Sequence, residues 1–150
     1  MQTQTDEKTI LHLFTEIAMV EHLLRNRYDQ SSPAGMTTRQ FGILTHFIRN
    51  GKSEETLALL AWAFQDSDDY MAEKVASLVE RGLLTARPAD IGDHVIVSIT
   101  DQGRAAHAQA LEEIRPEVEQ LLEGIELEDL KTSLRVVQEI RRTLDNLPDR

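Results

Sequence analysis

Histidine and acidic side chains are the groups in this chain that could bind a metal ion or transfer a proton. The 150 residues include 26 acidic residues, five histidines and no cysteine, which excludes thiolate metal sites, thiol catalysis and disulfides. No histidine pair has His-x-x-x-His spacing, and no Gly-rich phosphate loop or Gly-x-Ser-x-Gly motif is present. The residues predict no enzyme, no cofactor and no resident metal, and a metal-sensing site built from His107 and glutamates stays open as the alternative.

The densest group of charged side chains lies between Asp66 and Gly82, where five acids accompany two bases. At about 100° per residue of a helix, Met71, Val75 and Leu78 share one face, which we expect to be buried. The acids at the helix start complement the helix dipole and cap free N–H groups. The polar residues that remain at its start, on its outer face and on its flanks are Ser67, Asp69, Tyr70, Glu73, Lys74, Ser77 and Glu80.

The neighbouring segments follow the order of a winged helix-turn-helix, a fold used mostly to read DNA. Apolar residues at intervals of three and four predict the helices, and alternation predicts two strands. The third helix is apolar nearly all round, so we expect it at the centre of the domain. The predicted helices are 6–28, 38–50, 54–65, 67–81, 101–123 and one after Gly124, and the strands are 83–87 and 94–100.

The two ends of the chain carry apolar stripes that a single subunit has little material to cover. We therefore expect one domain over residues 1–150, with a winged helix part at about 37–100 and dimerisation helices at about 6–30 and 101–147. The alternative is that the terminal helices pack on each other within a monomer. The residues expected at the dimer interface are Ile10, Phe14, Ile17, Leu127, Leu130, Leu134, Val137, Ile140 and Leu144.

Several short motifs, in order along essentially the whole chain, resemble those of MarR-type regulators. Residues 36–44 (MTTRQFGIL) resemble the family's LT-x-x-Q-x-x-x-L at its second helix, and 56–61 (TLALLA) resemble its T-x-x-x-LA. Residues 78–84 (LVERGLL) are similar to LE-x-x-GL-V, and 98–103 (SITDQG) to V-x-LT-x-x-G. Residues 124–130 (GIELEDL) are similar to the start of the family's last helix.

The resemblance implies a mainly α fold with a small β-hairpin wing, in a homodimeric transcription regulator. Such proteins are usually repressors released by a small aromatic or phenolic ligand. The family's wing carries Asp-Arg-Arg near its tip, whereas this chain has Ile91-Gly92-Asp93, which leaves Arg87 and His94 as the nearby contacts. The candidate DNA-binding residues are Arg39, Ser67, Asp69, Tyr70, Glu73, Lys74, Ser77, Arg87 and His94.

The charge of the chain favours a second hypothesis beside the regulator. The net charge is −10, and the segment 37–100 has nine acids against six bases, which argues against non-specific coating of nucleic acid. The alternative is a MarR-like dimeric scaffold that has lost DNA binding and acts through protein partners or as a DNA mimic; a ligand carrier or sensor ranks third. We expect a cytoplasmic protein without a membrane span.

The aromatic residues allow two interpretations. They either form core or line a pocket for the aromatic ligand that the resemblance implies, and we favour the core. The aromatic residues and histidine concerned are Phe14, His22, Phe41, Phe47, Trp62 and Phe64.

Overall fold

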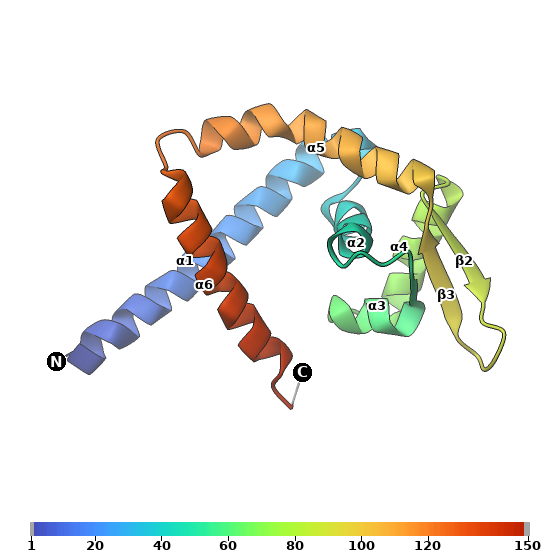
Figure 1. Ribbon diagram of the computed structural model, residues 1–150, viewed down its shortest axis with the longest axis horizontal. Helices are drawn as coiled ribbons and strands as arrows, with labels where there is room; N and C mark the ends of the chain where they lie inside the picture. The colour runs from blue at the N-terminus through green and yellow to red at the C-terminus, as the bar shows by residue number, and fades with distance from the viewer. Residues whose placement is uncertain (1, 149–150) are drawn as a thin grey trace. The chain divides into compact units, whose positions relative to one another are not determined.

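The computed structural model describes residues 2–148, and Figure 1 labels its helices and strands. The chain divides into two compact units between Ile114 and Arg115. The predicted fold class, mainly α with a β-hairpin wing, is confirmed. The elements in chain order are α1 (Gln2–Ser31), the short 3-10 helix η1 (Pro33–Gly35), α2 (Thr38–Arg49), β1 (Glu54–Thr56), α3 (Leu57–Ala63), α4 (Asp68–Glu80), β2 (Leu84–Pro88), β3 (Val95–Ile99), α5 (Asp101–Leu121) and α6 (Leu127–Asp145).

The first unit is built around one hydrophobic core shared by α2, α3, α4 and the strands. Each large apolar side chain that is fully buried there contributes about 1.5–3 kcal/mol relative to an exposed one. Met71, Val75 and Leu78 are all buried, so the predicted inner face of α4 is confirmed. The largest fully buried side chains are Phe47, Met36, Ile43, Leu44, Leu60, Met71, Leu78, Leu84 and Val97.

The sheet is antiparallel, with strand order β1-β3-β2. Strands β2 and β3 form the predicted hairpin, in which Leu84 lies opposite Ile99 and Pro88 lies opposite Val95. Because β2 is an edge strand, Pro88 removes no hydrogen bond from the interior of the sheet. The hairpin therefore projects from the core as the wing expected after α4.

Strand β1 corrects one sequence prediction. Residues 54–56 were expected to begin the third helix, but they pair with β3, with Glu54 opposite Ser98 and Thr56 opposite Ile96. Thr56 then caps α3, since its hydroxyl accepts the N–H of Leu59 at 3.2 Å. The helix begins later than predicted because pairing with a strand distant in sequence outweighs local preference.

The central position expected for the third helix is also wrong. Leu60 and Ala61 are buried, but Leu59 and Trp62 are each 50% exposed. α3 has only seven residues, and one side of it faces the core through Leu57, Leu60 and Ala61 while Leu59 and Trp62 face outward. Helix α3 is therefore apolar on every side but buried on one side only.

The start of α5 is locked onto the end of α4. The hydroxyl of Thr100 donates to the carbonyl of Gly82 at 2.7 Å and accepts the N–H of Gly103 at 2.9 Å. A Cβ added to Gly103 would lie 2.2 Å from the carbonyl oxygen of Leu83. Only glycine fits at this position, so the two backbones are in direct contact.

The end of α1 is anchored to α2 through one carboxylate. The Asp29 carboxylate accepts two hydrogen bonds from Thr38, one from its N–H at 2.8 Å and one from the Thr38 hydroxyl at 2.7 Å. These two hydrogen bonds, the backbone one first, lower the pKa of Asp29, because they stabilise the charged form. The carboxylate thus fixes the chain on both sides of η1.

In the second unit, α6 buries none of its residues. Leu130 and Ile140 are half-buried, while the other apolar residues of its stripe are exposed. Charged pairs such as Arg135–Glu139 and Arg141–Asp145 lie in solvent along the same helix. The exposed members of the stripe are Leu127, Leu134, Val137 and Leu144.

Candidate nucleic-acid interface

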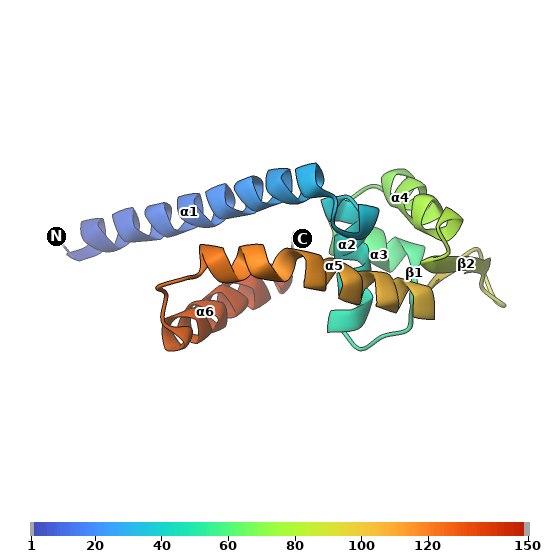
Figure 2. The same ribbon diagram turned by 90° about the horizontal axis from the view of Figure 1, so that it is seen from above.

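Helix α4 presents a polar face away from the core. Figure 2 shows α4 on the outside of the winged-helix body, residues 33–114, next to α2 and α3. Ser67 caps the helix, because its hydroxyl accepts the N–H of Tyr70 at 3.1 Å. Asp69, Tyr70, Glu73 and Glu80 are exposed. The outer face predicted from the sequence is therefore accessible to a partner.

The first turn of α2 lies along this face of α4. Thr37 and Gln40 form a capping box at the start of α2. The Gln40 side chain also donates to the hydroxyl of Ser77 at 3.0 Å, and that hydroxyl donates to the carbonyl of Lys74 at 2.7 Å. Ser77 is half-buried and joins α4 to α2, so it positions the helix.

Arg39 is held by an acid at the turn before α4. Its Nε lies 3.4 Å from Oδ2 of Asp66, and its guanidinium stacks on Phe64 at 5.0 Å from the ring centre. Both contacts join α2 to the α3–α4 turn. Arg39 therefore lies beside the turn that precedes α4, and it already has an anionic partner.

Lys74 and Tyr70 form one unit on the surface of α4. The Lys74 ammonium lies 5.0 Å from the centre of the Tyr70 ring, a cation–π distance. This contact keeps the cation on the flank of the helix. The two residues therefore offer a charge and an aromatic surface next to each other.

The wing carries little positive charge toward a partner. Arg87, on β2, pairs with Glu54 of β1 at 3.4 Å, and about half of each side chain is exposed. His94 is exposed at the end of the wing turn, where its carbonyl accepts the N–H of Ala89 at 2.8 Å. Ile91 at the tip is 87% exposed. The tip is therefore apolar and acidic, as its sequence indicated.

Arg81 has a structural role that sequence reasoning missed. Its guanidinium donates to the carbonyls of Ala34 and Gly35, at 2.9 and 3.2 Å, and so holds η1 against the end of α4. Arginine at the C-terminal end of a helix is common and gives no sign of such a distant partner. Most of the arginines described in the winged-helix body thus bind acids or carbonyls of the same chain.

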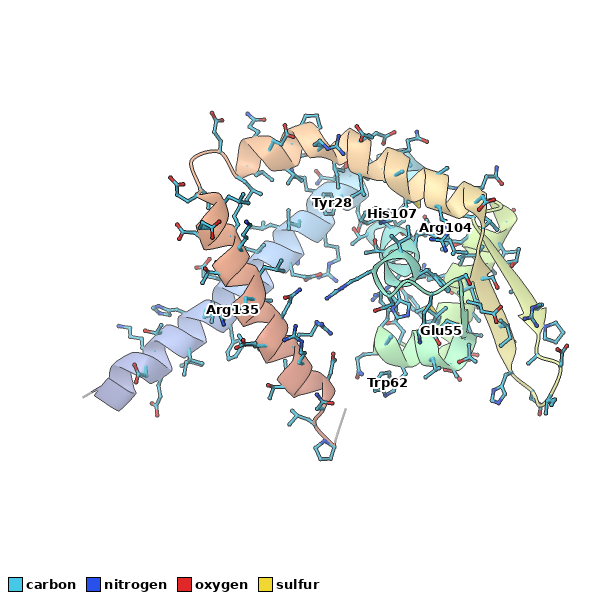
Figure 3. The ribbon with its side chains drawn as sticks, viewed as in Figure 1. Tyr28, Glu55, Trp62, Arg104, His107 and Arg135 are labelled. Atoms are coloured by element: carbon cyan, nitrogen blue, oxygen red, sulfur yellow. The ribbon has the colours of Figure 1, made fainter. Side chains whose placement is uncertain are left out.

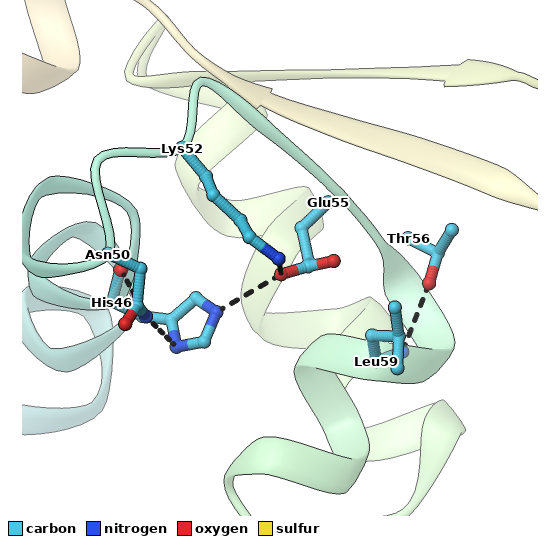
Figure 4. A network of polar contacts seen from close by, with 6 residues as sticks. All are labelled: His46, Asn50, Lys52, Glu55, Thr56 and Leu59. Atoms are coloured by element: carbon cyan, nitrogen blue, oxygen red, sulfur yellow. Dashed lines mark hydrogen bonds and ion pairs between the residues drawn. The ribbon is translucent and has the colours of Figure 1, made fainter.

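A polar network lies on another side of the first unit, beside α3 (Figure 4). Glu55 contacts both His46 Nε2 and Lys52 Nζ at 3.5 Å, and Asn50 contacts His46 Nδ1 at 3.3 Å. These residues, with Leu59, Trp62 and Ala63, line an open hollow of about 360 Å³. Trp62 therefore lines a surface hollow and does not fill the core.

Two of the other aromatic residues proposed for a ligand pocket lie in or beside the core. Phe47 is fully buried. Phe41 stacks on His107 of α5 with ring centres 4.8 Å apart, and it lines a cavity of about 10 Å³ with Tyr28, Met36 and Ile114. Such a volume holds about one water molecule. Figure 3 labels Tyr28 and His107 in this part of the first unit.

His107 is a buried hydrogen-bonded histidine. Its Nε2 lies 3.0 Å from the Thr45 hydroxyl, and burial lowers its pKa. Among the described side chains, those of residues 6–148, no three His, Cys, Asp or Glu come together as a metal site would require. The metal-sensing alternative for His107 thus gains no support from its surroundings. No helix in the described part of the chain has the length and apolar character to span a bilayer.

The order helix, turn, helix, wing defines a winged helix-turn-helix protein. No protein-family model and no curated protein matches the chain, but solved structures share its fold. A MarR-family transcriptional regulator from a Rhodococcus species matches with TM-score 0.75 and 16% identity, over 86% of this chain and 91% of its own.

Two further structures carry bound molecules. A mutant MarR from E. coli, complexed with operator DNA, matches with TM-score 0.69 and 18% identity, over 88% of this chain and 95% of its own. The organohalide-sensing regulator RdhR, bound to 2,4-dichlorophenol, matches with TM-score 0.70 and 19% identity, over 90% of this chain and 80% of its own. The chain has the MarR-type winged-helix fold.

Proposed function

We propose that this protein is a DNA-binding transcription regulator of the MarR type and not an enzyme. The observation that carries the proposal is the accessible outer face of α4, flanked by the first turn of α2 and followed by the wing. This arrangement suits a helix that enters the major groove while neighbouring elements contact the backbone. The MarR structure with operator DNA supports the same use of the fold.

The acids of α4 have a role in this proposal. Asp69 and Glu73 are exposed, and a carboxylate can accept a hydrogen bond from the amino group of cytosine in the major groove. Lys74 and Tyr70 on the same helix then contact phosphate or base edges, and Arg87 or His94 contact the backbone or minor groove. Few cations are available, so binding depends on a narrow set of sequences.

We propose that the active form is a homodimer. The apolar residues along α1 and α6 are exposed or half-buried, including Phe14, Ile17 and Leu134. Burying them between two copies removes apolar surface from water, which favours association. A dimer also presents two copies of α4 to two half-sites, one helical turn or a multiple of it apart.

We further propose that the protein is a repressor released by a small aromatic ligand. The RdhR structure with 2,4-dichlorophenol supports this class of ligand. The cavity beside Phe41 and Tyr28 holds only about 10 Å³, so an aromatic molecule must open it on binding.

Titration of the protein with the DNA upstream of its own gene tests the proposal. We expect sequence-specific retardation that weakens about tenfold or more between roughly 50 and 200 mM salt, since released counterions drive binding. A scrambled DNA of equal length is the control. No retardation at micromolar protein and low salt would falsify the regulator.

Charge reversal at Glu73 tests the face of α4. If this face points at DNA, Glu73→Lys exchanges a repulsion for an attraction of about 1 kcal/mol each, so non-specific affinity rises roughly 30-fold per protomer. Glu119→Lys, an exposed site on α5 outside the winged-helix body, makes the same change in net charge and serves as the control. Equal effects of the two variants would mean that α4 does not face the DNA.

A dimeric scaffold that binds protein partners, or mimics DNA, is the second candidate. The internal use of Arg39, Arg81 and Arg87 favours it, because these cations already contact acids or carbonyls. The scaffold predicts no retardation of any DNA at low salt. The same titration therefore separates the two candidates.

A further inference from the structure

The start of α2 places a guanidinium next to the turn that leads into α4. The capping box of Thr37 and Gln40 fixes the first turn, and the Gln40–Ser77 hydrogen bond sets that turn along α4. Arg39, between the two capping residues, is thereby directed to the α3–α4 turn. These hydrogen bonds fix the backbone on both sides of Arg39.

The backbone of Asp66, the partner of Arg39, is also held in place. Gln65 before it adopts φ +55°, in the left-handed region, and the Asp66 N–H donates to the carbonyl of Ala61 at 2.9 Å. Its side chain is 15% exposed. Within residues 2–148, its Oδ2 has no exposed surface and no hydrogen-bond partner, which leaves the Arg39 guanidinium at 3.4 Å as the charge that compensates it.

The Arg39–Asp66 pair differs from the pair in the wing. The side chains of Arg87 and Glu54 are each about half exposed, so water competes for both ions and the pair exchanges easily. Arg39 is 34% exposed, stacks on Phe64 and faces a carboxylate oxygen that water does not reach. A carboxylate oxygen shielded from water is costly to leave without its cation, so Asp66 retains Arg39.

We propose that Asp66 masks Arg39 and thereby sets the affinity of the protein for DNA. A DNA phosphate beside the first turn of α2 must compete with Asp66 for the same guanidinium. This inference rests on the proposed function for its effect on DNA, whereas the masking itself is a property of the free protein. Asp66 is accordingly a positioning residue, which acts through Arg39.

Removal of the Asp66 charge tests the proposal, with Asp68→Asn as the matched control. Asp68 is exposed in the first turn of α4, and its replacement removes the same charge two residues away. Asp66→Asn should raise affinity about fivefold per protomer, as for one unit charge near a phosphate. It should also steepen the slope of log affinity against log salt by about 0.9 per protomer, because a new phosphate contact forms.

The control should raise affinity less and leave the salt slope unchanged. The double variant Arg39→Gln/Asp66→Asn should return to the slope of the wild type, since the released cation is gone. Asp66→Ser provides a second variant if Asp66→Asn does not fold. Equal slopes for Asp66→Asn and Asp68→Asn would overturn the proposal.

The masking is measured separately by the reaction of Arg39 with phenylglyoxal, followed by peptide mass spectrometry. We expect faster modification of Arg39 in Asp66→Asn than in Asp68→Asn, with no DNA present. Equal rates overturn the proposal even if both variants bind DNA. If Arg39 is modified faster in Asp66→Asn but no variant binds DNA, the proposed regulator is overturned, and with it the role of Asp66 in DNA binding. The masking of Arg39 by Asp66 is then still supported. DNA binding gained by Asp66→Asn alone supports both.

Discussion

The winged-helix body and α6 carry similar apolar repeats but use them in opposite ways. Met71, Val75 and Leu78 recur at three and four along α4 and are buried. Leu127, Leu134 and Leu144 belong to a similar repeat along α6, and all are exposed. Periodicity thus identifies an amphipathic helix, but not the surface that covers it.

The physical difference lies in what surrounds each helix. α4 contacts α2, α3 and β2 within one core, so its stripe is covered within its own unit. α6 carries a similar apolar stripe but buries none of its residues. Under the proposed homodimer, α6 obtains its cover from a second copy, so the same substitution should have different consequences in the two helices.

Leu78→Ala should produce the largest effect in this comparison. Leu78 is fully buried, and truncation of a buried leucine costs about 2–5 kcal/mol of the free energy of unfolding. Urea denaturation at several protein concentrations measures it. We expect the free energy of unfolding lost in Leu78→Ala to be independent of protein concentration. The free energy lost in Leu134→Ala should grow with protein concentration. Similar behaviour of both variants would remove the distinction between body and α6.

Leu134→Asp should weaken the dimer while the winged-helix body stays folded. A charge placed within a buried interface removes about 2 kcal/mol or more, roughly a 30-fold rise in the dissociation constant. Sedimentation measures association, and circular dichroism reports the fold. Arg135→Ala, which breaks only the exposed pair with Glu139, is the control and should change little. An unchanged dissociation constant for Leu134→Asp would show that this stripe is not the interface.

The smallest expected effect is a dependence of stability on pH that originates in the body. Burial lowers the pKa of His107 below the usual value of about 6.5. The unfolded chain therefore takes up a proton that the folded chain resists, so stability is lost as the pH falls below about 6.5.

His107→Gln should reduce that loss of stability between pH 7 and pH 5. Thermal unfolding across this pH range measures it, with His94→Gln in the exposed wing as the control. If both variants follow the wild-type pH dependence, His107 does not supply the effect.

The sequence predicted what local periodicity determines. The inner face of α4 and the β2–β3 hairpin both follow from spacing within a few residues. Strand β1 does not, because Glu54–Thr56 becomes extended only by pairing with β3. The run of apolar residues after it favoured a longer helix, and a distant hydrogen-bond partner reversed that preference.

The sequence predicted which residue types form the candidate interface. It did not predict which of their charges are free to contact a partner. Counting acids and bases identified an electronegative surface. It did not show that Arg39 faces Asp66, that Arg87 faces Glu54 or that Arg81 binds the carbonyls before α2. These partners are brought together by the tertiary fold, so residues distant in sequence decide which cations are available.

The contact between Gly103 and Leu83 makes the junction of α4 and α5 mechanically stiff. A methyl group at Gly103 would lie 2.2 Å from the Leu83 carbonyl oxygen, and Thr100 ties both backbones together. The first turn of α5 cannot roll about its axis without displacing the residues that end α4. We therefore expect a rotation of that turn to move the end of α4 with it, because the two backbones are in direct contact.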